Sequence, residues 1–142
     1  MNSLSFRTKI MRHLLLLLSG VTAVAIAIAI LFVPELFYAG YGIEVAGDAA
    51  LKNELKAPAG LLLAGGGLML VGAFRARWTT QALVIAAVVY LSYGLSRFAG
   101  FALDGMPGGG LFAAALFEIG IGAIALLALI PETRSRIAGT AQ

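Results

Sequence analysis

Cysteine is absent from this chain of 142 residues, and histidine occurs once. The lack of cysteine excludes disulfides, thiolate metal sites, cysteine nucleophiles and redox pairs. His13 has no second imidazole with which to hold a metal or a haem, so we expect no metal and assign no cofactor. Charge is also scarce, because 12% of the residues are charged and 61% are hydrophobic. A soluble domain has roughly 25% charged residues, so this composition favours a membrane protein.

Four long apolar segments make up most of the chain. Each is close to the roughly 20 residues that cross a bilayer, and we therefore predict membrane-spanning helices over residues 14–33, 57–74, 81–103 and 111–130. The first segment is too long for the apolar core of a cleaved signal peptide and ends in bulky residues, so we expect no cleavage. The predicted fold class is all-α, an integral membrane four-helix bundle that forms a single domain over residues 1–142.

The connections between these segments contain most of the polar residues and helix breakers. Residues 34–56 form one long outer loop, in which Asp48 is placed to cap a helix that begins outside the bilayer and enters it. Pro58 should start or kink the membrane portion of that helix. Pro131 is expected to stop the fourth helix and to leave residues 131–142 as a short, mobile cytoplasmic tail.

The basic residues are concentrated on one side of the predicted membrane. Seven of the ten Lys and Arg lie before the first span, in the turn with Arg75 and Arg77, and in the tail. The positive-inside rule then places both termini in the cytoplasm, with Tyr38, Tyr41 and Trp78 as interfacial anchors. We expect a multi-pass protein of a cytoplasmic (inner) membrane, with the lipid bilayer as its main partner. Because orientation accounts for the basic residues, no nucleic-acid partner is expected.

Two charged residues lie within the predicted spans, where a charge costs at least about 2.5–3.5 kcal/mol. Arg97 precedes the outer end of the third span by about six residues, and Glu118 follows the start of the fourth by about seven. At ~1.5 Å per residue, both should lie roughly 10 Å below the outer surface. We therefore predict an Arg97–Glu118 ion pair between neighbouring helices. A structural lock is the favoured role for such a pair, and a functional site is the alternative.

Other polar side chains can reach the same level of the bundle. Tyr90, Tyr93 and Arg97 are spaced by three and four residues, so they share one helix face. Our only concrete site hypothesis is an outward-facing polar pocket, whose candidate residues are Asn53, Glu54, Tyr90, Tyr93, Arg97, Asp104 and Glu118. The simpler interpretation is that both tyrosines pack helices and that Glu54 belongs to a solvated helix end. No catalytic residue is assigned.

Glycine is abundant in the second span. Small residues allow membrane helices to approach closely, because no side chain separates the two backbones. The residues that we assign to helix packing are Gly60, Gly65, Gly66, Gly67 and Gly122.

Three short motifs resemble a known family. They are NELKAPAG at residues 53–60, YLSYGLSR at residues 90–97 and LDG at residues 103–105. Together with Glu118 in the fourth span, they resemble a bacterial family of small membrane proteins called domain of unknown function 4345, over most of the chain. The family is similar in layout to DoxX-like four-helix proteins, some of which are linked to respiratory or thiol-redox membrane complexes. The resemblance implies a bacterial inner membrane, and it brings no established activity, substrate or cofactor.

Three classes of function are consistent with these observations. The favoured one is a non-enzymatic bundle that binds a lipid-like molecule, a partner membrane subunit or a second copy of itself. The alternative is a membrane enzyme or redox accessory for a hydrophobic, quinone-like substrate, in which Glu118 or Glu54 carries a proton and Arg97 holds an oxygen. A small drug-efflux transporter is less favoured. Those transporters have an essential Glu in the first helix, and the first span here has no charge.

Overall fold

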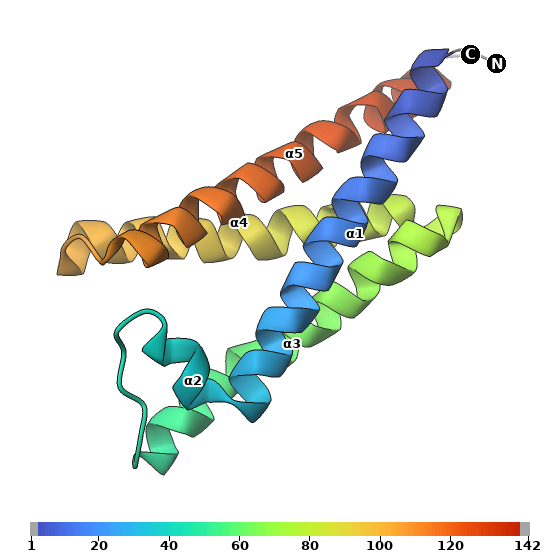
Figure 1. Cartoon of the computed structure of the whole chain (residues 1–142). Helices are drawn as coiled ribbons and strands as arrows, with labels where there is room; N and C mark the ends of the chain where they lie inside the picture. The colour runs from blue at the N-terminus through green and yellow to red at the C-terminus, as the bar shows by residue number, and fades with distance from the viewer. Residues whose placement is uncertain (1–2, 140–142) are drawn as a thin grey trace.

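The computed structural model describes the backbone of residues 3–139 and the side chains of residues 6–130. Helices and their connections make up this part of the chain, which contains no strand. The elements in order are α1 (Ser3–Phe32), α2 (Pro34–Ala39), α3 (Ala49–Phe74), the 3₁₀ turn η1 (Ala76–Trp78), α4 (Thr79–Asp104) and α5 (Gly109–Gly139), as Figure 1 shows. The predicted all-α fold class is confirmed.

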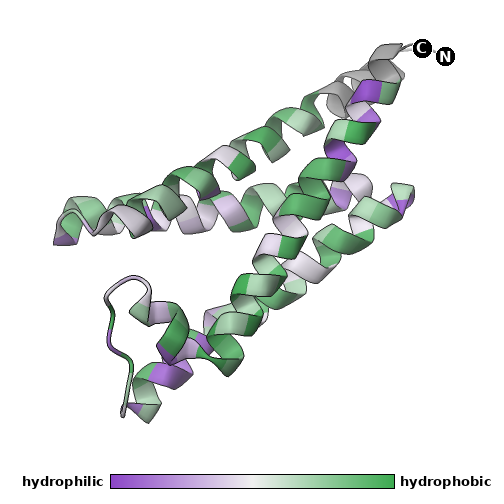
Figure 2. Ribbon diagram, in the orientation of Figure 1, coloured by the Kyte–Doolittle hydropathy of each residue, from purple (hydrophilic) through white to green (hydrophobic). Residues whose placement is uncertain are grey.

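The surface of the long helices is suited to lipid. Helices α1, α3, α4 and α5 are each long and apolar enough to cross a membrane. Large apolar side chains point outward along them, and the exposed fractions of Val21, Val88 and Leu127 are 56%, 60% and 62%. Figure 2 shows hydrophobic residues along the helices and hydrophilic residues mainly toward their ends and in the loop. Helices that are apolar on all sides are stable in a bilayer rather than in water, so the chain is a multi-pass membrane protein.

The long helices associate as two pairs. Helix α1 packs along α3, and α4 packs along α5, while α3 and α4 join the pairs (Figure 1). The pairs are closest near η1, where a Cβ at Gly72 would overlap the Cβ of Ala82. From there α3 and α4 diverge toward the end of the bundle that carries α2, which we call the loop end. Helices α1 and α5 contact each other at few residues.

Pro34 separates α1 from α2. A proline disfavours helical backbone at the residue before it, and Val33 has φ −134° and ψ 52°. Helix α1 therefore ends at Phe32. Pro34 then occupies the first turn of α2, where its missing N–H removes no helical hydrogen bond. The loop predicted over residues 34–56 thus contains a short helix and the first turns of α3.

Helix α5 continues through Pro131 to Gly139. The prediction that Pro131 stops the fourth helix is therefore wrong. A proline removes one backbone hydrogen bond and bends a helix, but the next residues can remain helical. Glu132, Arg134 and Arg136 are good helix formers and favour this continuation. The end of the predicted mobile tail, residues 140–142, lies outside the described residues.

Asp48 caps α3 as the sequence predicts, because its Oδ1 accepts a hydrogen bond from the backbone N of Leu51 at 3.0 Å. The helix then runs through Pro58 without interruption. Replacing Asp48 by Ala should destabilise the first turn by about 1 kcal/mol, and amide hydrogen exchange over residues 49–52 should become faster. Asp48→Asn keeps an acceptor oxygen and is the matched control. Equal exchange in Asp48→Ala and Asp48→Asn would show that the cap has no effect.

Glycines lie at the closest helix contacts. A Cβ at Gly66 would lie 3.0 Å from the carbonyl oxygen of Gly20 in α1. A Cβ at Gly122 would lie 2.9 Å from the backbone N of Leu91 in α4, and Gly65 faces α4 as well. These three glycines therefore occupy the helix-packing positions assigned to them. At Gly66 and Gly122 the neighbouring backbone leaves no room for a side chain, and Gly65 packs against side chains of α4.

Gly60 and Gly67 differ from the other assigned glycines. No atom lies within 4 Å of the place where their Cβ atoms would be, so the assignment to helix packing does not hold for them within the described chain. Successive residues are turned by about 100° around a helix, and Gly67 therefore points away from α1 when Gly66 points toward it. Gly94, which is not among the glycines assigned to helix packing, does pack, since its Cβ would lie 2.8 Å from Ile119 Cδ1.

Candidate functional site

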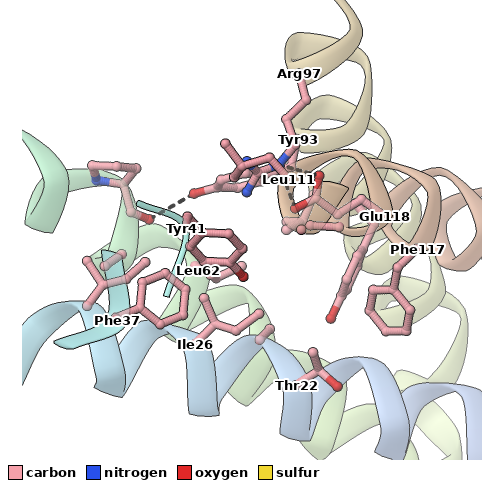
Figure 3. Close-up of a pocket in the computed structure, with 18 of the residues that line it drawn as sticks. Thr22, Ile26, Phe37, Tyr41, Leu62, Tyr93, Arg97, Leu111, Phe117 and Glu118 are labelled. Carbon is pink, nitrogen blue, oxygen red and sulfur yellow. Dashed lines mark hydrogen bonds and ion pairs between the residues drawn. The ribbon is translucent and has the colours of Figure 1, made fainter. Parts of the chain in front are cut away.

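A cavity of about 390 Å³ lies between the two helix pairs at the loop end. All five α-helices contribute to its wall, and Figure 3 shows Thr22 and Ile26 of α1 on one side and Phe117 and Glu118 of α5 on another. The cavity exists because α3 and α4 diverge and because α1 and α5 touch at few residues. Its volume falls within the ~300–1,000 Å³ of small-molecule sites.

Aromatic rings form much of the cavity wall. They are Phe37, Tyr38, Tyr41, Tyr90, Tyr93 and Phe117. The first three come from α2 and the turn after it, and the ring of Phe37 lies 5.2 Å from that of Tyr38 and 5.6 Å from that of Tyr41. Tyr41 also contacts the start of α5, because a Cβ at Gly110 would lie 3.3 Å from Tyr41 Cδ1. The segment formed by α2 and the turn after it, which we call the α2 segment, therefore extends over the cavity from α1 to α5.

Tyr38 and Tyr41, which the sequence predicts to be interfacial anchors, lie in the cavity wall. Burial raises the pKa of the Tyr38 phenol; the nearby Tyr93 adds to this effect, and Arg97 opposes it. Tyr38 therefore remains a hydrogen-bond donor at neutral pH. The sequence signal was their spacing of three residues after a helix-starting proline, which puts both rings on one side of a helical turn.

Arg97 and Glu118 form the predicted ion pair inside the bundle. Arg97 Nε donates to both carboxylate oxygens of Glu118, at 2.9 Å to Oε2 and 3.1 Å to Oε1. The side chain of Glu118 is 13% exposed and that of Arg97 is 33% exposed, and both line the cavity (Figure 3). Each charge neutralises the other, which reduces the cost of placing charged groups within a membrane-spanning segment.

Tyr90 and Tyr93 connect the helix pairs beside the cavity. The hydroxyl of Tyr90, a residue that is 4% exposed, donates to the carbonyl oxygen of Ser19 in α1 at 2.6 Å. The hydroxyl of Tyr93 donates to the carbonyl oxygen of Pro58 in α3 at 3.3 Å. Each bond crosses from α4 to the other pair, so these residues pack helices. Both rings also line the cavity, as the sequence predicts for the polar pocket.

Tyr90→Phe keeps the ring and removes its hydroxyl. We expect the free energy of unfolding to fall by about 1 kcal/mol, the usual contribution of one hydrogen bond. The measurement is SDS-induced unfolding in mixed micelles, followed by far-UV circular dichroism. Tyr93→Phe is the matched control, because its bond to Pro58 is longer and exposed. A larger loss in Tyr93→Phe than in Tyr90→Phe would contradict the expectation that the shorter, buried bond of Tyr90 contributes more to stability.

Three of the predicted pocket residues do not join the others. Asn53, Glu54 and Asp104 are exposed and lie outside the cavity. Helix α3 first lines the cavity at Pro58, and Asn53 lies roughly 7.5 Å farther along the helix at ~1.5 Å per residue. Asp104 is the last residue of α4, two turns beyond Arg97. The observed pocket is therefore smaller and more apolar than predicted, and of the predicted residues it keeps Tyr90, Tyr93, Arg97 and Glu118.

The cavity provides apolar contact over most of its wall, hydroxyl groups from several elements and one charged pair. Its aliphatic part includes Ile26, Ile30 and Leu62, and its charged part is the Arg97–Glu118 pair. Within the described residues, no three His, Cys, Asp or Glu side chains gather at a position that could hold a metal ion. Such a wall suits a molecule with an apolar body and one polar end.

Comparison with known proteins identifies the family. The family model described as a domain of unknown function (DUF4345) matches residues 11–129, which include all the residues that line the cavity. No curated protein and no solved structure gives a significant match to the chain. The resemblance noted from the three sequence motifs is thus confirmed. The chain belongs to the DUF4345 family.

Proposed function

We propose that this protein binds one lipid-like molecule in the cavity between its helix pairs. The observation that supports this most directly is a space of about 390 Å³ with apolar and aromatic walls and a single ion pair, Arg97–Glu118, on one side. The apolar body of the ligand lies against the helices, and its polar end lies at the ion pair. A stable charge pair within a membrane-spanning region is rare, and a water-accessible or ligand-accessible cavity is where such pairs usually occur.

The proposed orientation places the cavity toward the outer leaflet of a bacterial inner membrane. Arg75 and Arg77 lie at η1, at the opposite end of the bundle from α2. The positive-inside rule therefore puts η1 and both termini in the cytoplasm and the loop end outside. A ligand then reaches the cavity from the outer leaflet, beside α2.

Native mass spectrometry of the protein extracted gently from its own membrane tests the proposal. We expect the wild type to retain one amphiphilic molecule per chain. Ala114→Leu should lose it, because Ala114 lines the cavity one turn before Glu118 and leucine fills that space. Ala64→Leu is the matched control, since Ala64 is exposed on α3 and lies outside the cavity.

Two outcomes would contradict ligand binding. An empty wild-type chain that carries a stoichiometric protein partner would favour an accessory subunit of a larger complex. Equal retention of the amphiphile by Ala114→Leu and Ala64→Leu would show that the bound molecule is annular lipid, which coats the outside of the bundle.

A further inference from the structure

The charges of the cavity wall restrict the head group that can enter it. Among the side chains that the structure describes, Arg97 and Glu118 are the only Lys, Arg, Asp or Glu that line the cavity, so this wall has no net charge. An anionic head group in contact with Arg97 would also lie close to Glu118, and the cavity would then hold an uncompensated negative charge. Like charges brought together out of water are strongly unfavourable. An uncharged head group leaves the net charge of the cavity at zero.

Arg97 retains hydrogen-bonding capacity in spite of its ion pair. It contacts both oxygens of Glu118 through Nε alone. A guanidinium group has five N–H donors and no acceptor. Within the described part of the chain, no acceptor bonds to the terminal Nη groups, and the side chain is 33% exposed. These donors require an acceptor oxygen, which water supplies in the empty cavity and a ligand supplies in the occupied one.

Aromatic rings line the cavity into which such an oxygen would enter. Figure 3 shows Phe37 and Tyr41 from the α2 segment on one side of the cavity, with Tyr93 beside the guanidinium and Phe117 farther along α5. Aromatic walls favour a planar ring over a flexible chain, because rings stack or meet edge to face. A cavity of about 390 Å³ is near the lower limit of small-molecule sites, so it holds a head group rather than a whole two-chain lipid.

We propose that the ligand has an uncharged planar head with a carbonyl oxygen, as in a quinone or an aromatic ketone, and that this oxygen accepts hydrogen bonds from the Nη groups of Arg97. The apolar tail leaves between α1 and α5, where the two helices contact each other at few residues. Fatty acids and lipid phosphates are disfavoured, because their charge conflicts with Glu118. This inference rests on the proposed function and adds the chemical class of the ligand.

Three probes with the same tail test this class. They are decyl-para-benzoquinone, para-decylbenzoate and decylbenzene, and their binding is measured by equilibrium dialysis of protein-loaded against empty nanodiscs. The wild type should bind the quinone at least about tenfold more tightly than the benzoate, because of the charge of Glu118. It should also prefer the quinone to decylbenzene by about tenfold, because the quinone supplies an acceptor oxygen for the Arg97 Nη groups and decylbenzene does not.

Two variants separate the contributions of the pair. Glu118→Gln keeps an acceptor oxygen for Arg97 Nε and removes the negative charge, so affinity for the benzoate should rise at least about tenfold. Arg97→Met/Glu118→Leu removes both charges and should bind the quinone and decylbenzene equally. Thermal unfolding of each variant, followed by circular dichroism, shows that the bundle is folded before the probes are compared.

The possible results distinguish the two proposals. A wild type that prefers the benzoate would overturn the assignment of an uncharged head and leave ligand binding in place. The same applies to a Glu118→Gln variant whose affinity for the benzoate is unchanged. A wild type that binds none of the three probes above the level of empty nanodiscs would overturn both the ligand class and the proposed function.

Discussion

Arg97→Ala is expected to lower the free energy of unfolding by about 3 kcal/mol, because Glu118 would remain as an enclosed carboxylate without its partner. This expected loss of stability is at the lower end of the range for breaking a buried ion pair. The reason is that Arg97 is 33% exposed, so water can partly replace its contact with Glu118. SDS-induced unfolding in mixed micelles, followed by far-UV circular dichroism, measures the change. Arg77→Ala, which removes an exposed arginine at η1, is the control and should unfold like the wild type.

The double variant Arg97→Met/Glu118→Leu separates stability from binding. It replaces two charges by apolar side chains of similar size, which is often neutral for stability. We expect it to recover most of the stability lost in Arg97→Ala and to remain unable to hold the native ligand in native mass spectrometry. If the double variant retained the ligand as the wild type does, the pair would be a structural lock and the site hypothesis would be wrong.

The Arg97–Glu118 ion pair could be predicted because it depends only on the depth of each charge and on the short turn that joins the two helices. Two charges at similar depth on helices joined by a short turn have few other partners in a bilayer. The positions of the four spans follow from apolar length in the same way, and only their ends differ, as at Gly139, where α5 extends beyond Pro131. The position of a helix end depends on single backbone hydrogen bonds. The free energy of one such bond is small compared with that of placing a whole apolar span in the bilayer, so the apolar pattern locates the span better than its ends.

The cavity could not be predicted, because it depends on the angles between helices. Its size follows from the divergence of α3 and α4, and its aromatic cover follows from the path of α2 after Pro34. Neither is encoded in the periodicity of one segment. The prediction that Asn53 joins Arg97 in the pocket was wrong for the same reason. The rise per residue predicts the depth of each side chain in the membrane, but it does not predict the direction in which the two helices separate.

The glycine run of α3 shows a similar limit of the sequence. Three consecutive glycines indicate a close contact between helices, but they cover most of a helical turn. The structure distinguishes Gly66, which meets the backbone of α1, from Gly67, which meets no other helix in the described chain. This contrast allows one substitution to be tested at two neighbouring positions.

Gly66→Leu should prevent the bundle from folding. A Cβ at this position already lies 2.9 Å from Val24 Cγ2 and 3.0 Å from the backbone oxygen of Gly20, and that oxygen cannot rotate away. A larger side chain must push α1 from α3, and we expect a loss of at least about 3 kcal/mol, the upper part of the range for overpacked cores. The measurement is the yield of monodisperse protein in gel filtration, together with its thermal unfolding.

Gly67→Leu is the matched control and should fold with wild-type stability or slightly more, because leucine has the higher helix propensity and no atom lies within 4 Å of the position of its Cβ. The same variant tests whether the face of α3 at Gly67, which packs against no other helix in the described chain, binds a partner. If Gly67→Leu folds normally but no longer co-purifies with a subunit that the wild type retains, this face binds a partner. If Gly66→Leu folds as well as Gly67→Leu, the close contact between α1 and α3 is wrong, and the arrangement of the cavity walls that depends on it is wrong too.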